Sequence, residues 1–280
     1  MKNVIVLANG AKAHVRRAVD EALPWLREQA HLVVVDLEEK VDIEHVAADM
    51  VIIFGGDGAI LSAARRLGRN QVPAVGVNLG KFGFLAEVSL SELRSGLGRI
   101  LAGEFQAASR MMLQCRVKRG ERLIKDSLAL NDAVISRSSL SRLIAIQLSI
   151  DSEEVTKYYC DGLIVSTPVG STAHSLAAGG PILTHDMEAF IVTPICPHTL
   201  TNRPLVVSAQ RRIEMGVLPE AKSVALTVDG QVYVELLPGD RVQVERSELR
   251  FQLIQTQERT FFQTLREKLQ WGGHPKYAGR

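Results

Sequence analysis

The sequence has few cysteines, and their arrangement suits neither a disulfide framework nor a metal site. Its 280 residues contain three cysteines, Cys115, Cys160 and Cys196, and no pair has C-x-x-C spacing. Neither a structural zinc site nor a redox dithiol is indicated, and the odd number argues against a disulfide framework. Reduced thiols are typical of the cytoplasm, so we expect a cytoplasmic protein.

Long apolar runs and one-sided clusters of basic residues are also missing. No apolar run approaches the ~20 residues that a helix needs to cross a bilayer, so we expect no membrane partner. The opening MKNVIVLANG has too short an apolar run for a signal peptide. Acids and bases are interspersed with a formal net charge of +2, which argues against nucleic-acid binding. The absence of G-x-x-x-x-G-K-[ST] excludes a Walker-type P-loop.

The first hundred residues alternate short apolar runs with helical patterns. The runs that predict buried strands are residues 4–8, 32–36, 50–54 and 72–78. The helical patterns cover residues 11–29 and 60–68. A further helix is indicated by Ser89 and Glu92, which have capping-box spacing, and by Gly103, which suits its end. This alternation predicts an open parallel sheet covered by helices on both faces.

From about residue 105 the segments become short, alternating and separated by turns. Those that predict antiparallel strands are residues 111–120, 143–151, 223–236 and 240–254. The Asp-Gly pair within VDGQV favours a tight hairpin turn, and we assign it no other role. We therefore predict an α/β domain over residues 1–105 and a β-rich, sandwich-like domain over residues 106–258. A helical tail over residues 259–280 is expected to pack back on them.

The stretch VIIFGGDG places a single carboxylate, Asp57, among three glycines at the exit of a predicted strand. Ligands bind at the carboxyl ends of such strands, and glycines and a helix start together offer N–H groups to a phosphate. A carboxylate beside a phosphate suits an Mg²⁺ contact or a base that takes a hydroxyl proton, and both belong to phosphoryl transfer. The alternative is that Asp57 only occupies a turn or caps the helix.

Three later stretches place polar groups where strands end. Asn78 and Gly80 lie in a loop that can also be a plain connection. Asn131 and Asp132 combine an amide with a carboxylate, which can bind two ribose hydroxyls or form an Asx-type turn. Residues 161–182, DGLIVSTPVGSTAHSLAAGGPI, place hydroxyl groups before a helix of small residues. Such a helix lets a flat ligand come close, or packs closely against a sheet.

In this order the motifs resemble the NAD kinase family. They are GGDG at 55–58, NLGKFGFL at 78–85, LND at 130–132, the whole of 161–182, and CPHTLTNRPL at 196–205. GGDG is shared with phosphofructokinase-like and diacylglycerol kinase-like enzymes, whereas the T-P-x-G-S-T-A segment is far more specific. The resemblance implies an N-terminal open parallel α/β domain of the NAD kinase/diacylglycerol kinase-like type, followed by a C-terminal β-rich domain.

The resemblance also implies an activity. It implies transfer of the γ-phosphate of ATP to the 2′-hydroxyl of the adenosine ribose of NAD, giving NADP and ADP, with Mg²⁺ or another divalent cation. In the family a neighbouring subunit completes the dinucleotide pocket, so a homodimer or homotetramer is expected. Two alternatives stay open: a lipid or sugar-phosphate kinase that shares only GGDG, and a non-catalytic NAD(P)-binding sensor.

Roles for single residues follow from the same resemblance. Asp57 is implied to be the catalytic residue next to the 2′-hydroxyl, as base or as organiser of Mg²⁺. The residues implied to bind substrate are Gly56, Asp57, Gly58, Asn131, Asp132, Asp161, Thr172, Ala173 and His174. Those implied to cradle phosphate are Gly55, Gly56, Gly58, Asn78 and Gly80. Ala59 and His174 depart from the family, which usually has Thr and Tyr there; they bear on donor choice and affinity.

Overall fold

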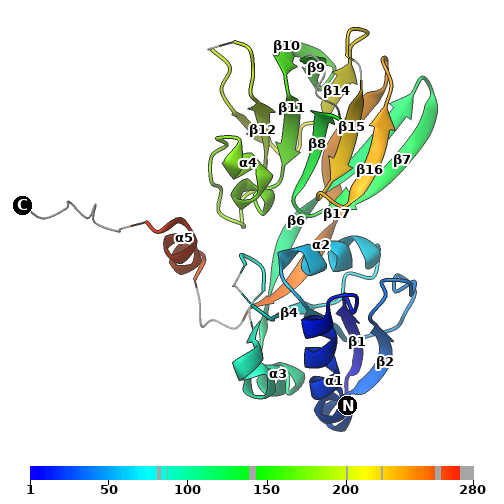
Figure 1. Ribbon diagram of the computed structural model, residues 1–280, viewed down its shortest axis with the longest axis vertical. Coiled ribbons are helices and arrows are strands. Elements are labelled where there is room, and N and C mark those ends of the chain that lie inside the picture. Colours follow the sequence, from blue (N-terminus) through cyan, green and yellow to red (C-terminus); the bar gives the residue numbers. More distant parts are fainter. Residues whose placement is uncertain are drawn as a thin grey trace, which may run out of the picture.

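The fold consists of two regions that share two long strands. The computed structural model describes residues 1–80, 83–86, 88–138, 143–199, 201–221, 223–255 and 260–271. Strands β6 (Gln106–Arg119) and β17 (Arg241–Gln255) run from the lower, N-terminal region of Figure 1 into the upper, C-terminal region. Because these strands belong to both regions, the division at residues 105 and 258 stays a prediction.

The N-terminal region is built on a parallel sheet. Its strands are β1 (Asn3–Ala8), β2 (His31–Asp36), β3 (Met50–Phe54), β4 (Ala74–Asn78) and β5 (Val88–Ser89). They lie in the order β2-β1-β3-β4-β5, and β17 joins β4 in parallel, with Leu253 opposite Ala74. Strands covered on both faces are apolar throughout, which is why MVIIF of β3 is completely buried.

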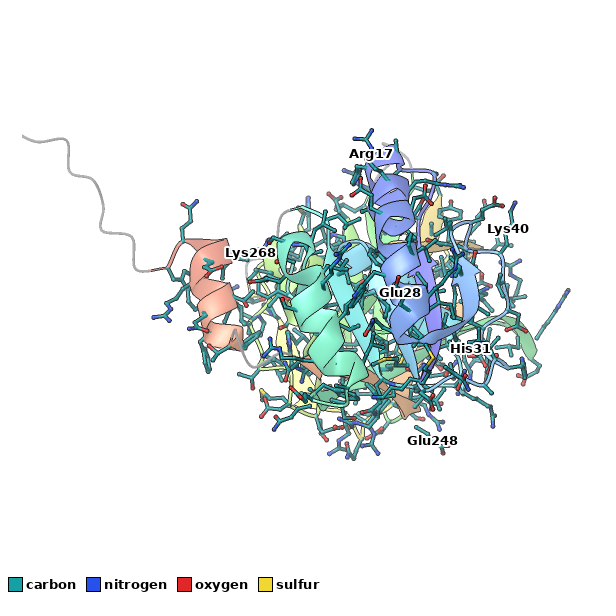
Figure 2. All side chains as sticks on the ribbon, turned by 90° about the horizontal axis from the view of Figure 1, so that it is seen from below. Arg17, Glu28, His31, Lys40, Glu248 and Lys268 are labelled. Carbon is teal, nitrogen blue, oxygen red and sulfur yellow. The ribbon has the colours of Figure 1, made fainter. Side chains whose placement is uncertain are left out.

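Helices cover both faces of this sheet, as the alternating pattern predicts. They are α1 (Ala13–Gln29), α2 (Asp57–Arg66) and α3 (Leu93–Leu101), the last preceded by a 3-10 turn at Leu90–Glu92. The first and third helices pack on one face and α2 on the other, so α2 lies between the sheet and the C-terminal region. Ser89 caps the 3-10 turn by accepting the N–H of Glu92 at 3.3 Å. Figure 2 shows α1 and α3 side by side, with Arg17 and Glu28 on α1.

The C-terminal region consists of two sheets around one core. Its further strands are β7 (Arg122–Ala129), β8 (Asp132–Arg137), β9 (Ile144–Ile150), β10 (Glu153–Cys160), β11 (Gly162–Ser166), β12 (Ala189–Ile195), β13 (Leu205–Ser208), β14 (Ile213–Val217), β15 (Val224–Val228) and β16 (Val232–Leu236). One antiparallel sheet has the order β13-β12-β11-β8-β15-β16. The other contains β10, β9, β14, β17, β6 and β7 and continues into the parallel sheet. Side chains of both sheets, such as Leu148 and Leu163, share one buried cluster, which confirms the β-rich fold class.

Two local predictions can be compared directly with the backbone. Asp229 and Gly230 have φ of 50° and 65° between β15 and β16, as a tight primed hairpin turn requires. The predicted helix of small residues is short. A 3-10 turn at Gly170–Thr172 leads into α4 (His174–Ala177), and Gly179, with φ of 85°, then reverses the chain. The glycines that allow close packing also end the helix early.

The last helix, α5 (Phe261–Leu269), begins with a capping box formed by Thr260. It contacts the segment that follows α4, because the ring of Phe261 lies 4.5 Å from that of His185 in an edge-on arrangement. Leu265 on the same helix is buried. The predicted tail beyond residue 271 lies outside the described residues. Within the described part of the chain, no helix has the length and apolar character needed to span a membrane.

Candidate active site

A pocket of about 630 Å³ opens where β3 and β4 end. All five residues implied to cradle phosphate border it; they are Gly55, Gly56, Gly58, Asn78 and Gly80. Asn78 shapes the rim, because its side chain accepts the N–H of Gly80 at 3.1 Å and donates to the carbonyl of Gly80 at 3.2 Å. Lys12 and His14, which sequence reasoning missed, also line the pocket. Their position after β1 becomes apparent only when the strand ends meet.

The two helix starts that border this pocket suit an anion. Helices α1 and α2 both begin there, with Lys12 and Gly56 as N-cap residues, and neither start has a side-chain cap. Uncapped N–H groups and the positive ends of two helix dipoles therefore face one space. Gly55 has a φ of 152°, and a Cβ at this position would lie 2.8 Å from the Cβ of Ala59. A side chain there would narrow the turn that exposes these N–H groups.

Asp57 lies beside this pocket, as the first residue of α2. Its Oδ2 accepts the N–H of Phe84 at 2.9 Å and its Oδ1 accepts the N–H of Leu85 at 3.1 Å. A Cβ on Gly83 would lie closer than 3.0 Å to three atoms of this carboxylate, so the loop passes directly over it. Residues 81, 82 and 87 of that loop lie outside the described residues. Each oxygen keeps a further lone pair with which to meet a cation or a proton.

A second polar cluster lies where β11 ends and β8 begins. Asp132 stands opposite Ser166 in the antiparallel register, and both residues are buried. The Oδ1 of Asn131 and the Oγ of Ser166 are buried side-chain atoms without a hydrogen-bond partner in the described structure. Because an unpaired buried polar atom is costly, hydroxyl groups of a ligand are suitable partners for this cluster. Sequence reasoning singled out Asn131 and Asp132 but missed Ser166, whose residue type carries no distinguishing signal.

The charge state of this cluster is unusual. Burial, together with the nearby negative charge of Asp229, raises the pKa of Asp132 to about 7. Near neutral pH the carboxyl of Asp132 is therefore present in both forms and can accept or donate a hydrogen bond to a sugar hydroxyl. Sequence analysis treated Asp229 as a turn residue, because an Asp-Gly pair already explains a hairpin.

Thr172, Ala173 and His174 belong to the same end of β11 as Asp132. They lie in the 3-10 turn and at the start of α4, where His174 is exposed and the hydroxyl of Thr172 donates to the carbonyl of Val169 at 3.1 Å. This turn packs directly on Asn131, since a Cβ on the turn's glycine at position 170 would lie closer than 3.0 Å to the carbonyl of Asn131. The structure therefore brings this group next to the buried cluster.

Asp161 lies elsewhere. It precedes β11, whereas Asp132 is opposite the last residue of that strand, so roughly 17 Å of strand separates them. Its carboxylate is paired with Arg137, whose Nε lies 3.0 Å from Oδ1. Within one chain, Asp161 is thus not brought together with the other residues implied to bind substrate.

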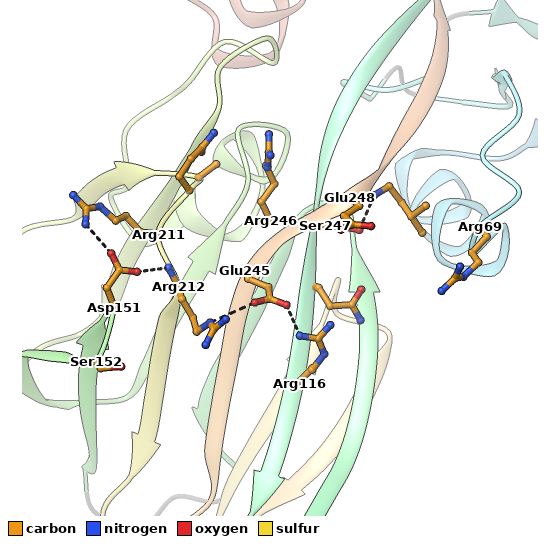
Figure 3. Close-up of a pocket in the computed structure, with 14 residues that line it drawn as sticks. Arg69, Arg116, Asp151, Ser152, Arg211, Arg212, Glu245, Arg246, Ser247 and Glu248 are labelled. Atoms are coloured by element: carbon orange, nitrogen blue, oxygen red, sulfur yellow. Dashed lines mark hydrogen bonds and ion pairs between the residues drawn. The ribbon is translucent and has the colours of Figure 1, made fainter.

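A larger hollow of about 920 Å³ lies mainly on the C-terminal region and is bordered by Arg69 of the N-terminal region (Figure 3). Its arginines are largely paired: Arg211 lies 2.7 Å from Asp151. The Nε of Arg212 lies 3.5 Å from a carboxylate oxygen of Glu245. None of the residues implied to bind substrate or phosphate borders it among those described. We interpret it as a solvated network of ion pairs, because four of its five arginines contact carboxylates.

Comparison with known proteins decides which family this geometry represents. The model of the ATP-NAD kinase N-terminal domain matches residues 6–105, and that of the ATP-NAD kinase C-terminal domain matches residues 130–256. The chain belongs to the NAD kinase family. It is 41% identical to the NAD kinase of Rhodopirellula baltica, with 96% of this chain and 87% of that protein covered. It is 39% identical to that of Desulforamulus reducens, over 96% and 97%.

Solved structures of NAD kinase family members share the fold. Yeast NADH kinase complexed with NADH superposes with a TM-score of 0.88 at 25% identity, with 100% of this chain and 90% of that chain covered. The NAD kinase from Archaeoglobus fulgidus in complex with ATP gives 0.76 at 29% identity, over 96% and 98%. Family membership confirms the resemblance found in the motifs and makes the chain a phosphotransferase of the NAD kinase type, in preference to a lipid or sugar-phosphate kinase.

Proposed function

We propose that this chain transfers the γ-phosphate of ATP to the 2′-hydroxyl of the adenosine ribose of NAD, giving NADP and ADP. The observation that carries this proposal is a pair of sites: a pocket at two uncapped helix starts, and a buried cluster with unpaired hydroxyl-binding atoms at Asn131 and Ser166. The first suits a polyphosphate and the second suits ribose hydroxyls. Asp57 is the first residue of the helix whose start borders the pocket.

Each group then has a task in the transfer. The N–H groups at the starts of α1 and α2, with Lys12, offset the charge of the triphosphate. Asn131 and Asp132 orient the ribose of the acceptor. Phosphoryl transfer depends on positioning and charge neutralisation, so a carboxylate held by two N–H groups, as Asp57 is, presents a fixed oxygen. That oxygen takes the hydroxyl proton or organises the cation.

A divalent cation fits this arrangement as a partner of the nucleotide. No group of three or more His, Cys, Asp or Glu residues that could hold a metal occurs in the described parts of the chain. Mg²⁺ often binds through one or two carboxylates, with phosphate oxygens and water completing its shell. Asp57 is the carboxylate that we propose for this contact. When bound, the cation supplies positive charge next to the phosphates.

The direct test is NADP formation from NAD, ATP and Mg²⁺ by the wild type and by Asp57→Asn. We expect the wild type to turn over and the variant to lose at least about 10³-fold in kcat, because a base or metal ligand is removed. A wild type that makes no NADP with either ATP or polyphosphate would end the proposal. Full activity in Asp57→Asn would remove Asp57 from the chemistry and leave the activity in place.

We also propose a cytoplasmic homo-oligomer in which a second copy contributes Asp161. The location is supported by three free cysteines, two of them buried. The assembly is supported by the distance of Asp161 from the buried cluster of its own chain. Co-expression of Asp57→Asn with Asp161→Asn tests the shared site. In a mixed oligomer some sites would combine Asp57 of one copy with Asp161 of the other, which would restore part of the activity that each variant lacks. No recovery in a mixed oligomer would count against a shared site.

A further inference from the structure

The turn of the β15–β16 hairpin holds a carboxylate that the hairpin does not itself need. The side chain of Asp229 has no exposed surface. It accepts three successive backbone N–H groups, those of Leu130 at 3.1 Å, Asn131 at 2.8 Å and Asp132 at 3.2 Å. Successive N–H groups of this kind form an anion-binding concavity. Asp229 therefore sets the shape of the turn that presents Asn131 and Asp132.

The same hairpin turn contacts helix α2 through a residue of its last turn and a residue of its first turn. At the last turn of the helix, Nη1 of Arg65 lies 2.7 Å from Oδ2 of Asp229, and Nη2 donates to Oε1 of Gln231. At the first turn, Nε2 of Gln231 donates to the carbonyl of Gly58 at 2.8 Å. The helix has 10 residues, about 15 Å, and starts with Asp57. Arg65, the hairpin turn with Asp229 and Gln231, and Gly58 thus form a closed ring of contacts that begins and ends on α2.

This ring joins the two halves of the site. Asp57 belongs to the N-terminal region and the Asn131–Asp132 turn to the C-terminal region. A shift of α2 along or around its axis would break a charge-assisted hydrogen bond and leave Asp229 buried without its cation. Transfer is sensitive to such shifts, because misplacement by about 1 Å can cost about 10²-fold in rate.

We propose that Arg65, Asp229 and Gln231 are positioning residues for phosphoryl transfer. They hold the acceptor hydroxyl, bound at the Asn131–Asp132 turn, at a fixed place relative to Asp57. This inference rests on the proposed function. Arg65 and Asp229 act through the helix and the turn, whereas Gln231 also borders the phosphate pocket. Arg65 therefore gives the cleaner test.

Arg119 provides a matched control. Its Nε and Nη2 each lie 2.8 Å from the fully buried carboxylate of Asp240, inside the C-terminal region. Arg65→Gln and Arg119→Gln each remove the cation of a buried aspartate. We expect both variants to lose thermal stability, but only Arg65→Gln to lose kcat, by about tenfold to a hundredfold, with KM for NAD and ATP within about threefold. Arg65→Lys should recover part of kcat because it keeps the charge.

Two further variants keep the inference testable if Arg65→Gln fails to fold. Asp229→Asn should raise KM for NAD as well as lower kcat, because it loosens the turn itself. Gln231→Ala, at an exposed position, should lower kcat with KM for NAD unchanged. Equal kcat values for Arg65→Gln and Arg119→Gln, or for Gln231→Ala and the wild type, would overturn the inference. A wild type that forms no NADP would instead overturn the proposed function, so the two failures are distinguishable.

Discussion

Replacing Gly83 by alanine is expected to displace the carboxylate of Asp57 and lower activity, although Asp57 itself is unchanged. A Cβ at position 83 would lie closer than 3.0 Å to Cγ and to both carboxylate oxygens of Asp57, a separation that real Cβ atoms essentially never show. The effect of the substitution is therefore steric, and either the carboxylate or the loop above it must move.

The size of the effect follows from what that movement breaks. The N–H groups of Phe84 and Leu85 donate to the two carboxylate oxygens, and hydrogen bonds to a charged group contribute about 1.5–3 kcal/mol each. Since tenfold in rate corresponds to about 1.4 kcal/mol, loss of one such bond in the transition state lowers kcat by about tenfold to a hundredfold. Steady-state NADP formation at saturating NAD and ATP measures this value.

A second glycine supplies the control for this experiment. Gly98 lies in α3 with no atom within 4 Å of a Cβ at that position, so Gly98→Ala should keep wild-type kcat and gain up to about 1 kcal/mol in stability. A folded Gly83→Ala protein with wild-type kcat would refute the reasoning, because Asp57 would then tolerate loss of its fixed position.

Three further outcomes are expected. Burial raises the pKa of Asp132 from 3.8 to about 7, so its contribution to stability is complete below pH 4 and is lost as the pH rises through 7. Asp132→Asn does not titrate at this position. Between pH 4 and pH 8 its free energy of unfolding, measured by urea denaturation, should therefore improve relative to the wild type by up to about 4 kcal/mol. Of the three thiols only exposed Cys196 should react rapidly with a thiol reagent in the native protein, since burial raises the pKa of Cys115 and of Cys160 to about 12; rapid labelling of two would contradict this. Ala59→Thr adds a hydroxyl at the pocket rim and should lower KM for ATP by about threefold, with KM for NAD unchanged. Initial-rate kinetics in which both KM values change would contradict this.

Parts of the fold could be predicted because their signals are local. The run MVIIF is apolar throughout, which is the pattern of a strand buried on both faces, and β3 has these bounds. Ser89 begins a helical turn because its hydroxyl can reach the N–H of Glu92 three residues on. Asp229 and Gly230 form the hairpin turn because they accept positive φ with little strain.

The extent of α4 was harder to predict for a physical reason. Alanines such as Ala177 and Ala178 favour a helix, whereas the glycines at the end of the segment disfavour one. Composition alone does not show at which residue the helix ends. In the structure, Gly180 packs against Ser175 so closely that a Cβ there would overlap it. This close approach turns the chain after a single helical turn.

The candidate catalytic and binding residues could be identified in the sequence, whereas the residues that hold them in position could not. Asp57 stood out because a carboxylate among glycines is unusual, and Asn131 with Asp132 because an amide and a carboxylate adjoin. The contact of Gly83 with Asp57, the role of Arg65 and the second role of Asp229 left no signal, because each depends on a partner far away along the chain.

By itself, the sequence determined the alternating strands and helices of the first hundred residues, the β15–β16 hairpin turn, and the family to which the ordered motifs point. Those properties depend on neighbours within a few residues, where side-chain size and hydrogen-bonding reach act directly. Only the tertiary structure decided that the Asp57 carboxylate lies under a loop from the next strand, that Asp229 supports the Asn131–Asp132 turn, and that Asp161 lies at the far end of β11. These arrangements arise when distant segments pack together, because burial then forces each polar group to find its partner wherever the fold has placed one.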